Sequence, residues 1–197
     1  MIESVQRYAA LRPAVAAELA RRPWRDEFER WHLPFHRRLL PVLGELELQW
    51  THNDFHASNL LWTPDGQVAT VLDFGLADRS FAVHDLAVAI ERNAIEWLEL
   101  PGKGSAAVHF DAAAALLDGY QEVRELSAAE RRALPDILAL CQVDFALSEV
   151  DYFAGVTGSA ENAELAYRYL VDHTAWFATP LGSELLGSIA EHLRGSG

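Results

Sequence analysis

The sequence is short of cysteine, and this restricts how the fold can be stabilised. Among its 197 residues the one cysteine is Cys141, so no intramolecular disulfide bond can form. Disulfide bonds are a feature of oxidising compartments such as the secretory pathway and the periplasm. We therefore expect this chain in the cytoplasm.

Long apolar runs are also lacking. The run from Ala112 to Leu117 lies between two aspartates and is far shorter than the roughly 18 residues that a membrane span needs. The first residues carry an acid at Glu3 and lead into no apolar segment, which is not the pattern of a signal peptide. We expect no membrane partner.

Positive charge is scarce as well. The chain has 16 Lys and Arg residues against 29 Asp and Glu residues, and its formal net charge is −13. Such a charge repels the phosphate backbone of nucleic acids and favours cationic ligands. We therefore expect no nucleic-acid partner.

Apolar residues are plentiful, at 50% of the chain, as is typical of a globular protein with a core. Residues 1–44 show helical spacing of apolar side chains interrupted by prolines, residues 45–80 alternate as strands do, and residues 81–197 return to helical spacing. The last zone is expected to break at Gly102–Ser105 and at Thr157–Ser159. This pattern predicts a fold that is mainly α with a small β hairpin (α+β).

The middle zone carries the strand signals. Residues 46–50 alternate between apolar and polar side chains, which predicts a strand. Residues 60–63 and 67–72 flank the turn sequence Pro64-Asp65-Gly66 and predict a hairpin. The polar segment 51–59 is then expected to be a loop.

This loop and the segment after the hairpin hold the residues that suit catalysis. Asp54 has His52 two positions before it and Asn59 five positions after it, and Asp73-Phe74-Gly75 follows the hairpin. These spacings fit the H-x-D-x-x-x-x-N catalytic loop and the D-F-G metal-binding motif of kinases. Phosphoryl transfer needs a carboxylate to orient and deprotonate a hydroxyl, and oxygen ligands to hold Mg²⁺. Taken singly, each residue could instead cap a turn or end a strand.

Three segments resemble a known family. Residues 51–61, THNDFHASNLL, resemble the THGDLHPGNVL loop of the aminoglycoside phosphotransferase and choline kinase family. Val71–Gly75 resembles its IDFG segment, and His84–Ala87 resembles the YDLA that follows. The resemblance covers residues 41–100. It implies the carboxy-terminal lobe of a protein-kinase-like phosphotransferase fold, ATP and Mg²⁺ as cofactors, and a hydroxyl group of a small molecule as the acceptor.

The resemblance also implies a role for particular residues. It makes Asp54 the catalytic base, Asn59 and Asp73 the metal ligands, and His52, His56 and Asp85 the residues that support the loop. The second histidine, His56, favours this family over protein kinases, as does the absence of an Ala-Pro-Glu motif after Asp73.

Asn53 and Ala57 stand where the family commonly has Gly and Pro, which changes the stiffness of the loop.

Features of an ATP-binding lobe are missing from the sequence. Gly44 is the only glycine before Asp54, so no glycine-rich loop precedes the catalytic loop, and the only lysine is Lys103. The segment around Lys103 lacks the spacing of a phosphate loop and is expected to be a helix-ending turn. The chain could be a fragment or the partner of a separately encoded amino-terminal ATP-binding lobe, and alone it is expected to be inactive. A lone kinase-like lobe that acts as a non-catalytic binding module is the alternative.

The loop also allows a different chemistry. Alternate residues of an extended segment point to one side, so His52, Asp54 and His56 could bind a metal such as zinc. The protein would then be a metallohydrolase. This hypothesis leaves Asn59 and the Asp73-Phe74-Gly75 motif unexplained.

A second cluster bears on the acceptor. Asp144, Ser148 and Asp151 fall at helical positions i, i+4 and i+7, with Tyr152 beside them. If this face lines a cleft, Asp144, Asp151 and Tyr152 would suit an amine, a quaternary ammonium group or an aminoglycoside-like acceptor. The alternative is a solvated acidic helix face.

Overall fold

The computed structural model describes residues 1–100 and 104–195. Two compact units are present, and each is built from segments far apart in the sequence. The first comprises residues 1–40 and 139–183, and the second comprises residues 41–138 and 184–197. Residues 102 and 103 of the glycine-lysine turn expected at 102–105 lie outside the described residues.

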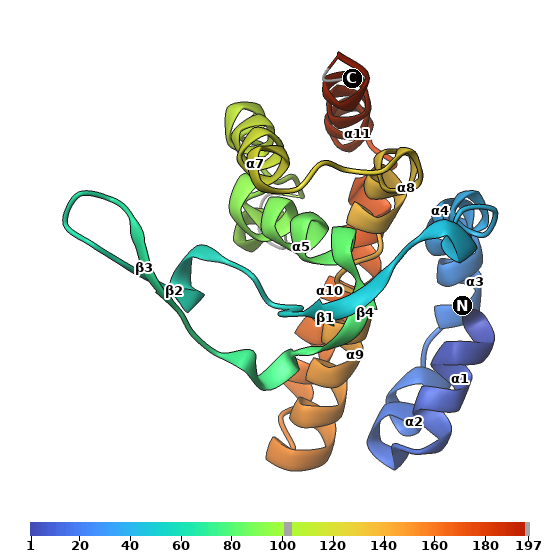
Figure 1. Cartoon of the computed structure of the whole chain (residues 1–197). Coiled ribbons are helices and arrows are strands. Elements are labelled where there is room, and N and C mark those ends of the chain that lie inside the picture. The colour runs from blue at the N-terminus through green and yellow to red at the C-terminus, as the bar shows by residue number, and fades with distance from the viewer. Residues whose placement is uncertain (101–103, 196–197) are drawn as a thin grey trace. The chain divides into compact units, whose positions relative to one another are not determined.

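The first unit is helical. Its helices are α1 (Ile2–Ala10), α2 (Pro13–Ala20), α3 (Trp24–Glu27), α4 (Leu33–Leu39), α9 (Val143–Asp151) and α10 (Ala160–Trp176), with π-helical turns at Phe28–His32 and Tyr152–Thr157 (Figure 1). Pro13 and Pro34 lie in the first turns of α2 and α4, where a missing N–H costs no hydrogen bond. The predicted break at 157–159 is confirmed, because Gly158 ends the second π turn at a φ of 68°.

The core of the first unit encloses a histidine. Val15, Phe28 and Leu170 are fully buried, and His32 is buried with them, stacked on the Phe28 ring at 3.9 Å between centroids. The His32 Nε2 atom lies 3.0 Å from the Leu170 carbonyl oxygen. Burial disfavours the charged imidazolium and lowers the pKa of His32 to about 4.

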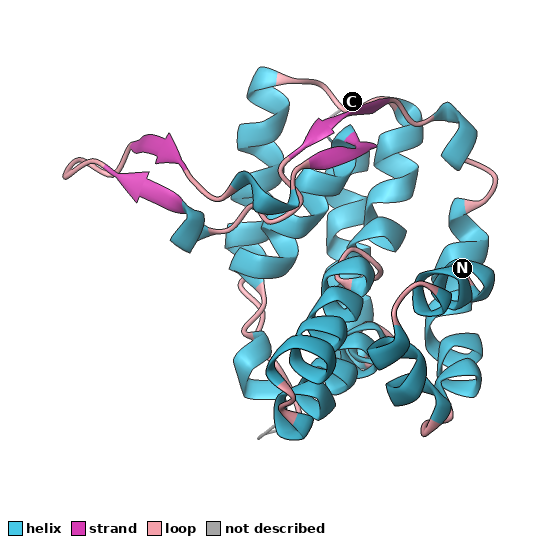
Figure 2. Cartoon of the chain, turned by 90° about the horizontal axis from the view of Figure 1, so that it is seen from below, coloured by secondary structure: helices cyan, strands magenta, loops and turns pink. Residues whose placement is uncertain are grey.

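The second unit contains two separate strand pairs among helices and loops (Figure 2). β1 (Leu48–Thr51) pairs antiparallel with β4 (Asp78–Phe81), and β2 (Leu60–Trp62) pairs antiparallel with β3 (Val68–Val71). The predicted hairpin is thereby confirmed, with Gly66 in its turn at a φ of 81°.

The first strand differs from the prediction. It begins at Leu48 because a 3₁₀ turn occupies Leu43–Glu45. Its partner β4 was not predicted, since Asp78-Arg79-Ser80 has no apolar alternation. Pairing with β1, and not side-chain pattern, makes this segment a strand.

Four helices complete the second unit. They are α5 (Ala82–Ala94), α7 (Phe110–Val123), α8 (Ala128–Leu138) and α11 (Pro180–Gly195), which belongs to this unit from Glu184 onward. α5 packs against α7 and α8, and its inward residues Val83, Ala87 and Ile90 are completely buried. None of the helices in the described part of the chain is long and apolar enough to cross a membrane.

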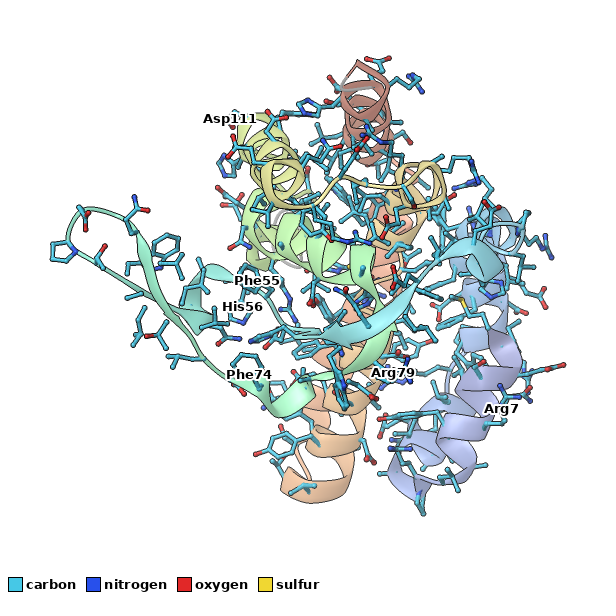
Figure 3. All side chains as sticks on the ribbon, viewed as in Figure 1. Arg7, Phe55, His56, Phe74, Arg79 and Asp111 are labelled. Carbon is cyan, nitrogen blue, oxygen red and sulfur yellow. The ribbon has the colours of Figure 1, made fainter. Side chains whose placement is uncertain are left out.

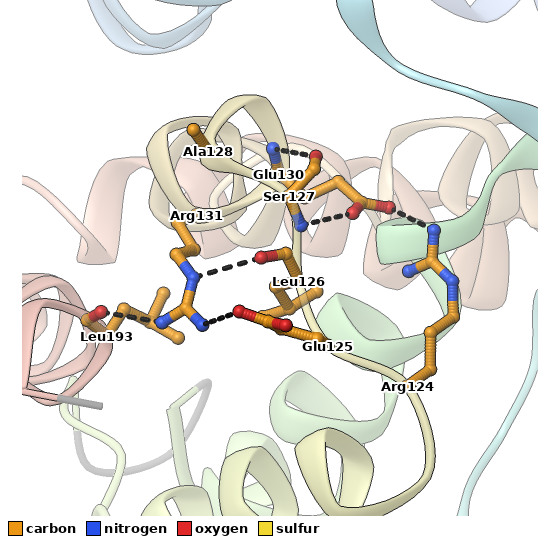
Figure 4. Close-up of a pocket in the computed structure, with 8 residues that line it drawn as sticks. All are labelled: Arg124, Glu125, Leu126, Ser127, Ala128, Glu130, Arg131 and Leu193. Carbon is orange, nitrogen blue, oxygen red and sulfur yellow. Dashed lines mark hydrogen bonds and ion pairs between the residues drawn. The ribbon is translucent and has the colours of Figure 1, made fainter. Parts of the chain in front are cut away.

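A pocket of about 510 Å³ lies around the start of α8 (Figure 4). Its polar groups bind one another: Glu130 accepts hydrogen bonds from Ser127 N and Arg124, and Ser127 Oγ accepts one from Glu130 N. Burial acts to raise the pKa of Glu130, but these hydrogen bonds outweigh it and lower that pKa. Arg131 donates to the carbonyl oxygens of Leu126 and Leu193. The arrangement caps α8 and ties it to α11.

We predict that acid destabilises the protein through His32. The unfolded chain protonates this imidazole near pH 6.5 and the folded chain only near pH 4, so the unfolded state binds more protons between these values. The contribution of the neutral His32 imidazole to the free energy of unfolding should be complete above about pH 6.5. The free energy of unfolding should then fall by about 3 kcal/mol as the pH drops to about 4. Urea unfolding at a series of pH values measures this slope.

His32→Phe keeps a ring against Phe28 and has no proton to bind, so it should flatten the slope. The same substitution at the exposed His109 serves as the control. An undiminished slope in the His32 variant would show that other groups cause the acid sensitivity.

Candidate functional site

The candidate site is the loop between β1 and β2 in the second unit, together with the turn after β3. Phe55 and His56 come from the loop, and Phe74 comes from the turn (Figure 3). The loop ends in a 3₁₀ turn at Ala57–Asn59 that leads directly into β2. The β2–β3 hairpin then returns the chain to Asp73.

One carboxylate holds the start of the loop. Asp85, in the first turn of α5, accepts hydrogen bonds from the main-chain N–H groups of His52 and Asn53, each at 2.7 Å. A carboxylate that accepts two main-chain N–H groups makes strong, charge-assisted bonds. Asp85 therefore joins the start of the loop to α5, and the loop-supporting role that the resemblance implies for it stays a prediction.

Asn53 takes a left-handed conformation, with a φ of 64°. Glycine adopts this conformation at no cost, and asparagine is among the side chains that tolerate it best. The Asn53 amide also fixes the bend, since it accepts a hydrogen bond from Thr51 Oγ1 at 2.8 Å and donates one to the Leu76 carbonyl at 2.9 Å. These contacts explain how asparagine serves where the resembled loop has glycine.

His52 connects the loop to the segment before Asp73. Its ring is buried, its Nε2 atom lies 2.8 Å from the Leu72 carbonyl oxygen, and its Nδ1 atom accepts from Asp54 N at 3.3 Å. This pattern places the proton on Nε2 and uses both ring nitrogens. The zinc hypothesis loses its His52 ligand, and the described residues include no group of three or more His, Cys, Asp or Glu placed to hold a metal ion.

Asp54 lies among groups that fix its carboxylate. Its side chain is 14% exposed, and its two oxygens lie 3.4 Å from His56 Nε2 and 3.5 Å from Arg92 Nη2. Asn59 Nδ2 donates to the Asp54 carbonyl at 2.9 Å and to its carboxylate at 3.2 Å. The amide nitrogen of Asn59 thus faces Asp54, and its oxygen remains available as a ligand.

Asp73 follows a residue whose main chain pairs with the end of the loop. The Asn59 carbonyl accepts a hydrogen bond from Leu72 N at 2.8 Å, and Asp73 is the next residue. Asp73 has a left-handed φ of 57°, and its Oδ1 accepts a hydrogen bond from Gly75 N at 3.3 Å. Carboxylate and amide oxygens are the ligands that Mg²⁺ prefers, so the side-chain oxygens of Asn59 and Asp73 are of the kind that suits this ion.

The residues predicted to bind the acceptor belong to the first unit. Asp144 and Tyr152 are exposed, and Asp151 forms an ion pair with Arg12 at 3.4 Å. The Arg12 guanidinium also lies over the Tyr8 ring, 3.7 Å from its centroid. Part of the negative charge of this helix face is therefore neutralised within the unit, and the acceptor-binding role of these three residues stays a prediction.

Two residues of α5 that contact the loop were not predicted. Arg92 lies beside the Asp54 carboxylate, and Asn93 Oδ1 accepts a hydrogen bond from Ala57 N at 2.9 Å. They follow Asp85 by seven and eight positions, a spacing that places side chains on one helix face. The helical periodicity after Asp85 was therefore a signal that could have identified them.

Comparison with known proteins finds a matching family and several relatives. A family model described as the phosphotransferase enzyme family matches residues 3–143. The homoserine kinase of Caulobacter sp. (strain K31) is 33% identical over 101 residues, which cover 47% of this chain and 29% of that protein. The homoserine kinase of Methylocella silvestris is 33% identical over 119 residues, which cover 60% of this chain and 35% of that protein. The chain thus spans about a third of the length of the curated relatives it matches.

We predict that Asp85→Ala destabilises the protein by about 2–3 kcal/mol, because two main-chain N–H groups lose their acceptor. Chemical denaturation measures the loss, and hydrogen exchange of the His52 and Asn53 amides should accelerate. Asp85→Asn retains one acceptor oxygen and should lose less. Asp111→Ala, at an exposed position in the first turn of α7, is the control and should cost about 0.5 kcal/mol. Equal losses at the two sites would contradict the role of Asp85.

Proposed function

The chain belongs to the phosphotransferase enzyme family, and from this premise we propose that its loop transfers the γ-phosphoryl group of ATP to a hydroxyl group of a small molecule. The family match confirms the resemblance drawn from the loop motifs. The mainly helical fold with small antiparallel strand pairs agrees with the protein-kinase-like fold that was predicted.

The observation that carries this proposal is the set of hydrogen bonds that connects Asp54, Asn59 and the residue before Asp73. Asn59 bonds both the main chain and the side chain of Asp54, and its own carbonyl pairs with the residue before Asp73. A carboxylate suited to accept a proton thus lies beside Asn59, whose amide oxygen can bind a divalent cation. Phosphoryl transfer depends on such positioning and charge neutralisation.

In the proposed mechanism, Asp54 orients the acceptor hydroxyl and takes its proton. His56 and Arg92 flank the carboxylate and restrict its rotation.

Asn59 Oδ1 and the Asp73 carboxylate would hold Mg²⁺, which when bound neutralises charge on the phosphates. His52 and Asp85 keep the loop in the conformation that these contacts require.

The acceptor that we propose carries both a hydroxyl and a protonated amino group. Relatives matching the chain are named homoserine kinases, and homoserine has both groups. The net charge of −13 favours a cationic ligand over an anionic one. Asp144, Asp151 and Tyr152 remain our candidates for the amino group.

The proposal also includes an ATP-binding lobe as a partner, on the same polypeptide or a separate one. Large apolar side chains around the loop are exposed: Leu48, Trp50, Leu61, Trp62, Val68 and Phe74, among which Trp50 is 72% exposed. Exposed apolar patches mark surfaces that bind other elements. The relatives, about three times as long as the matched segment, have room for such a lobe.

We predict that Asp54→Ala lowers kcat by about a hundredfold or more in the complete enzyme, because general base catalysis contributes at least this much. The substitution should leave the melting temperature nearly unchanged, since a loop carboxylate fills no core. Asp65→Ala, in the exposed hairpin turn, is the matched control. Near-normal turnover of the Asp54 variant would exclude it as the base.

Asp73→Asn should act through the metal. An amide is a weaker ligand than a carboxylate, so the variant should need more Mg²⁺ for half-maximal activity and should recover part of its kcat at high Mg²⁺. The measurement is kcat as a function of Mg²⁺ concentration. A loss that is the same at every concentration would remove Asp73 from the metal site.

Taken alone, the 197-residue chain is predicted to fold and to bind Mg·ATP weakly. It supplies two metal ligands, and its one lysine, Lys103, follows both motifs in the sequence. Charge interactions in an open, water-filled site are weak. Calorimetric titration of Mg·ATP should give a dissociation constant well above the micromolar range, and micromolar or tighter binding would show that the chain forms a complete nucleotide site.

A further inference from the structure

The 3₁₀ turn between the proposed base and the proposed metal ligand begins without a local cap. This turn, Ala57–Asn59, follows His56, whose side chain makes no capping hydrogen bond to it. Main-chain N–H groups at the start of a helical turn have no partner within the turn. Here the N–H of Ala57 finds one far away in the sequence, since it donates to Asn93 Oδ1 at 2.9 Å.

The Asn93 side chain is fixed at both ends. Its Nδ2 donates to the Ala89 carbonyl of the same helix at 2.7 Å, while its Oδ1 accepts from the loop. The helix therefore orients the amide so that its oxygen faces Ala57. An aspartate at this position would place an oxygen against the Ala89 carbonyl, where both atoms are acceptors.

The turn that Asn93 holds determines how Asp54 and Asn59 meet. Asn59 N donates to the His56 carbonyl at 2.9 Å, and Ser58 Oγ lies 2.7 Å from His56 Nδ1. Asn59 then reaches back to Asp54 through Nδ2. If the start of the turn shifts, the Asn59 amide and the Asp54 carboxylate lose their alignment together.

We propose that Asn93 is a positioning residue of the phosphoryl-transfer site, which fixes the Asp54–Asn59 geometry by capping the loop turn from α5. This role rests on the proposed function of the loop. Asp85 holds the start of the loop and Asn93 holds its end, so α5 fixes the loop at two points about two helical turns apart.

A proline at position 57 offers a test, because it can stiffen the turn without Asn93. Ala57 is the exposed first residue of the turn, and proline suits that position, with its φ fixed and its N–H absent. His56 is extended, at φ −141° and ψ 164°, as a residue before proline prefers to be. Ala57→Pro should therefore fit this backbone while it makes the Asn93 contact unnecessary.

The experiment compares Asn93→Ala, Ala57→Pro and the double variant in the complete enzyme. Asn93→Ala should lower kcat roughly tenfold while KM stays within about twofold, because one hydrogen bond that aligns the reacting groups is lost and no substrate contact is removed. The double variant should recover kcat to within about threefold of the parent. Asn162→Ala, at an exposed helical position, is the control and should change neither constant.

Hydrogen exchange of the Asn59 amide provides a readout that needs no activity. It should accelerate roughly tenfold in Asn93→Ala and slow again in the double variant. Unchanged kcat and exchange in Asn93→Ala, or a loss that proline does not relieve, would overturn the proposal. If the parent enzyme transfers no phosphate, the proposed function fails and Asn59 exchange alone decides whether Asn93 positions the turn.

Discussion

The pair of hydrogen bonds from His52 N and Asn53 N to the Asp85 carboxylate is the constraint on which the site depends. These bonds join α5 to the loop at the point where Asn53 reverses the chain with a left-handed φ. Next to this reversal, Asp54 N donates a hydrogen bond to Nδ1 of the His52 ring, and Nε2 of the same ring bonds the carbonyl of Leu72, the residue before Asp73. Two segments about twenty residues apart thereby meet through one carboxylate and one imidazole.

Much of this site could be predicted because its signals are local. The spacing of Asp54 and Asn59, and the hairpin turn at Gly66, depend on residues that are close in sequence, and the structure contains the loop and the hairpin where they were expected. The family follows from the same motifs. The hairpin could be predicted in this way because its turn is determined by the few residues that form it.

The features that sequence reasoning missed depend on contacts between distant residues. β4 is a strand because β1 pairs with it, and Asn93 contributes because Ala57, 36 positions earlier, lacks a local cap. The ion pair of Asp151 with Arg12 likewise joins the two separate sequence segments of the first unit. A single sequence contains no pattern for such pairs, apart from the helix-face periodicity that relates Asn93 to Asp85.

The central claim is that Asn59 and Asp73, from separate segments, form one site for a divalent cation beside Asp54. Paramagnetic broadening of amide NMR signals by Mn²⁺ tests it on this chain without ATP or an acceptor. The account predicts that the signals of residues 54–59 and 73–75 broaden first at substoichiometric Mn²⁺, and that excess Mg²⁺ restores them. Broadening that spreads instead over exposed acidic positions such as Asp111 and Glu161, as the net charge of −13 alone would produce, would contradict it.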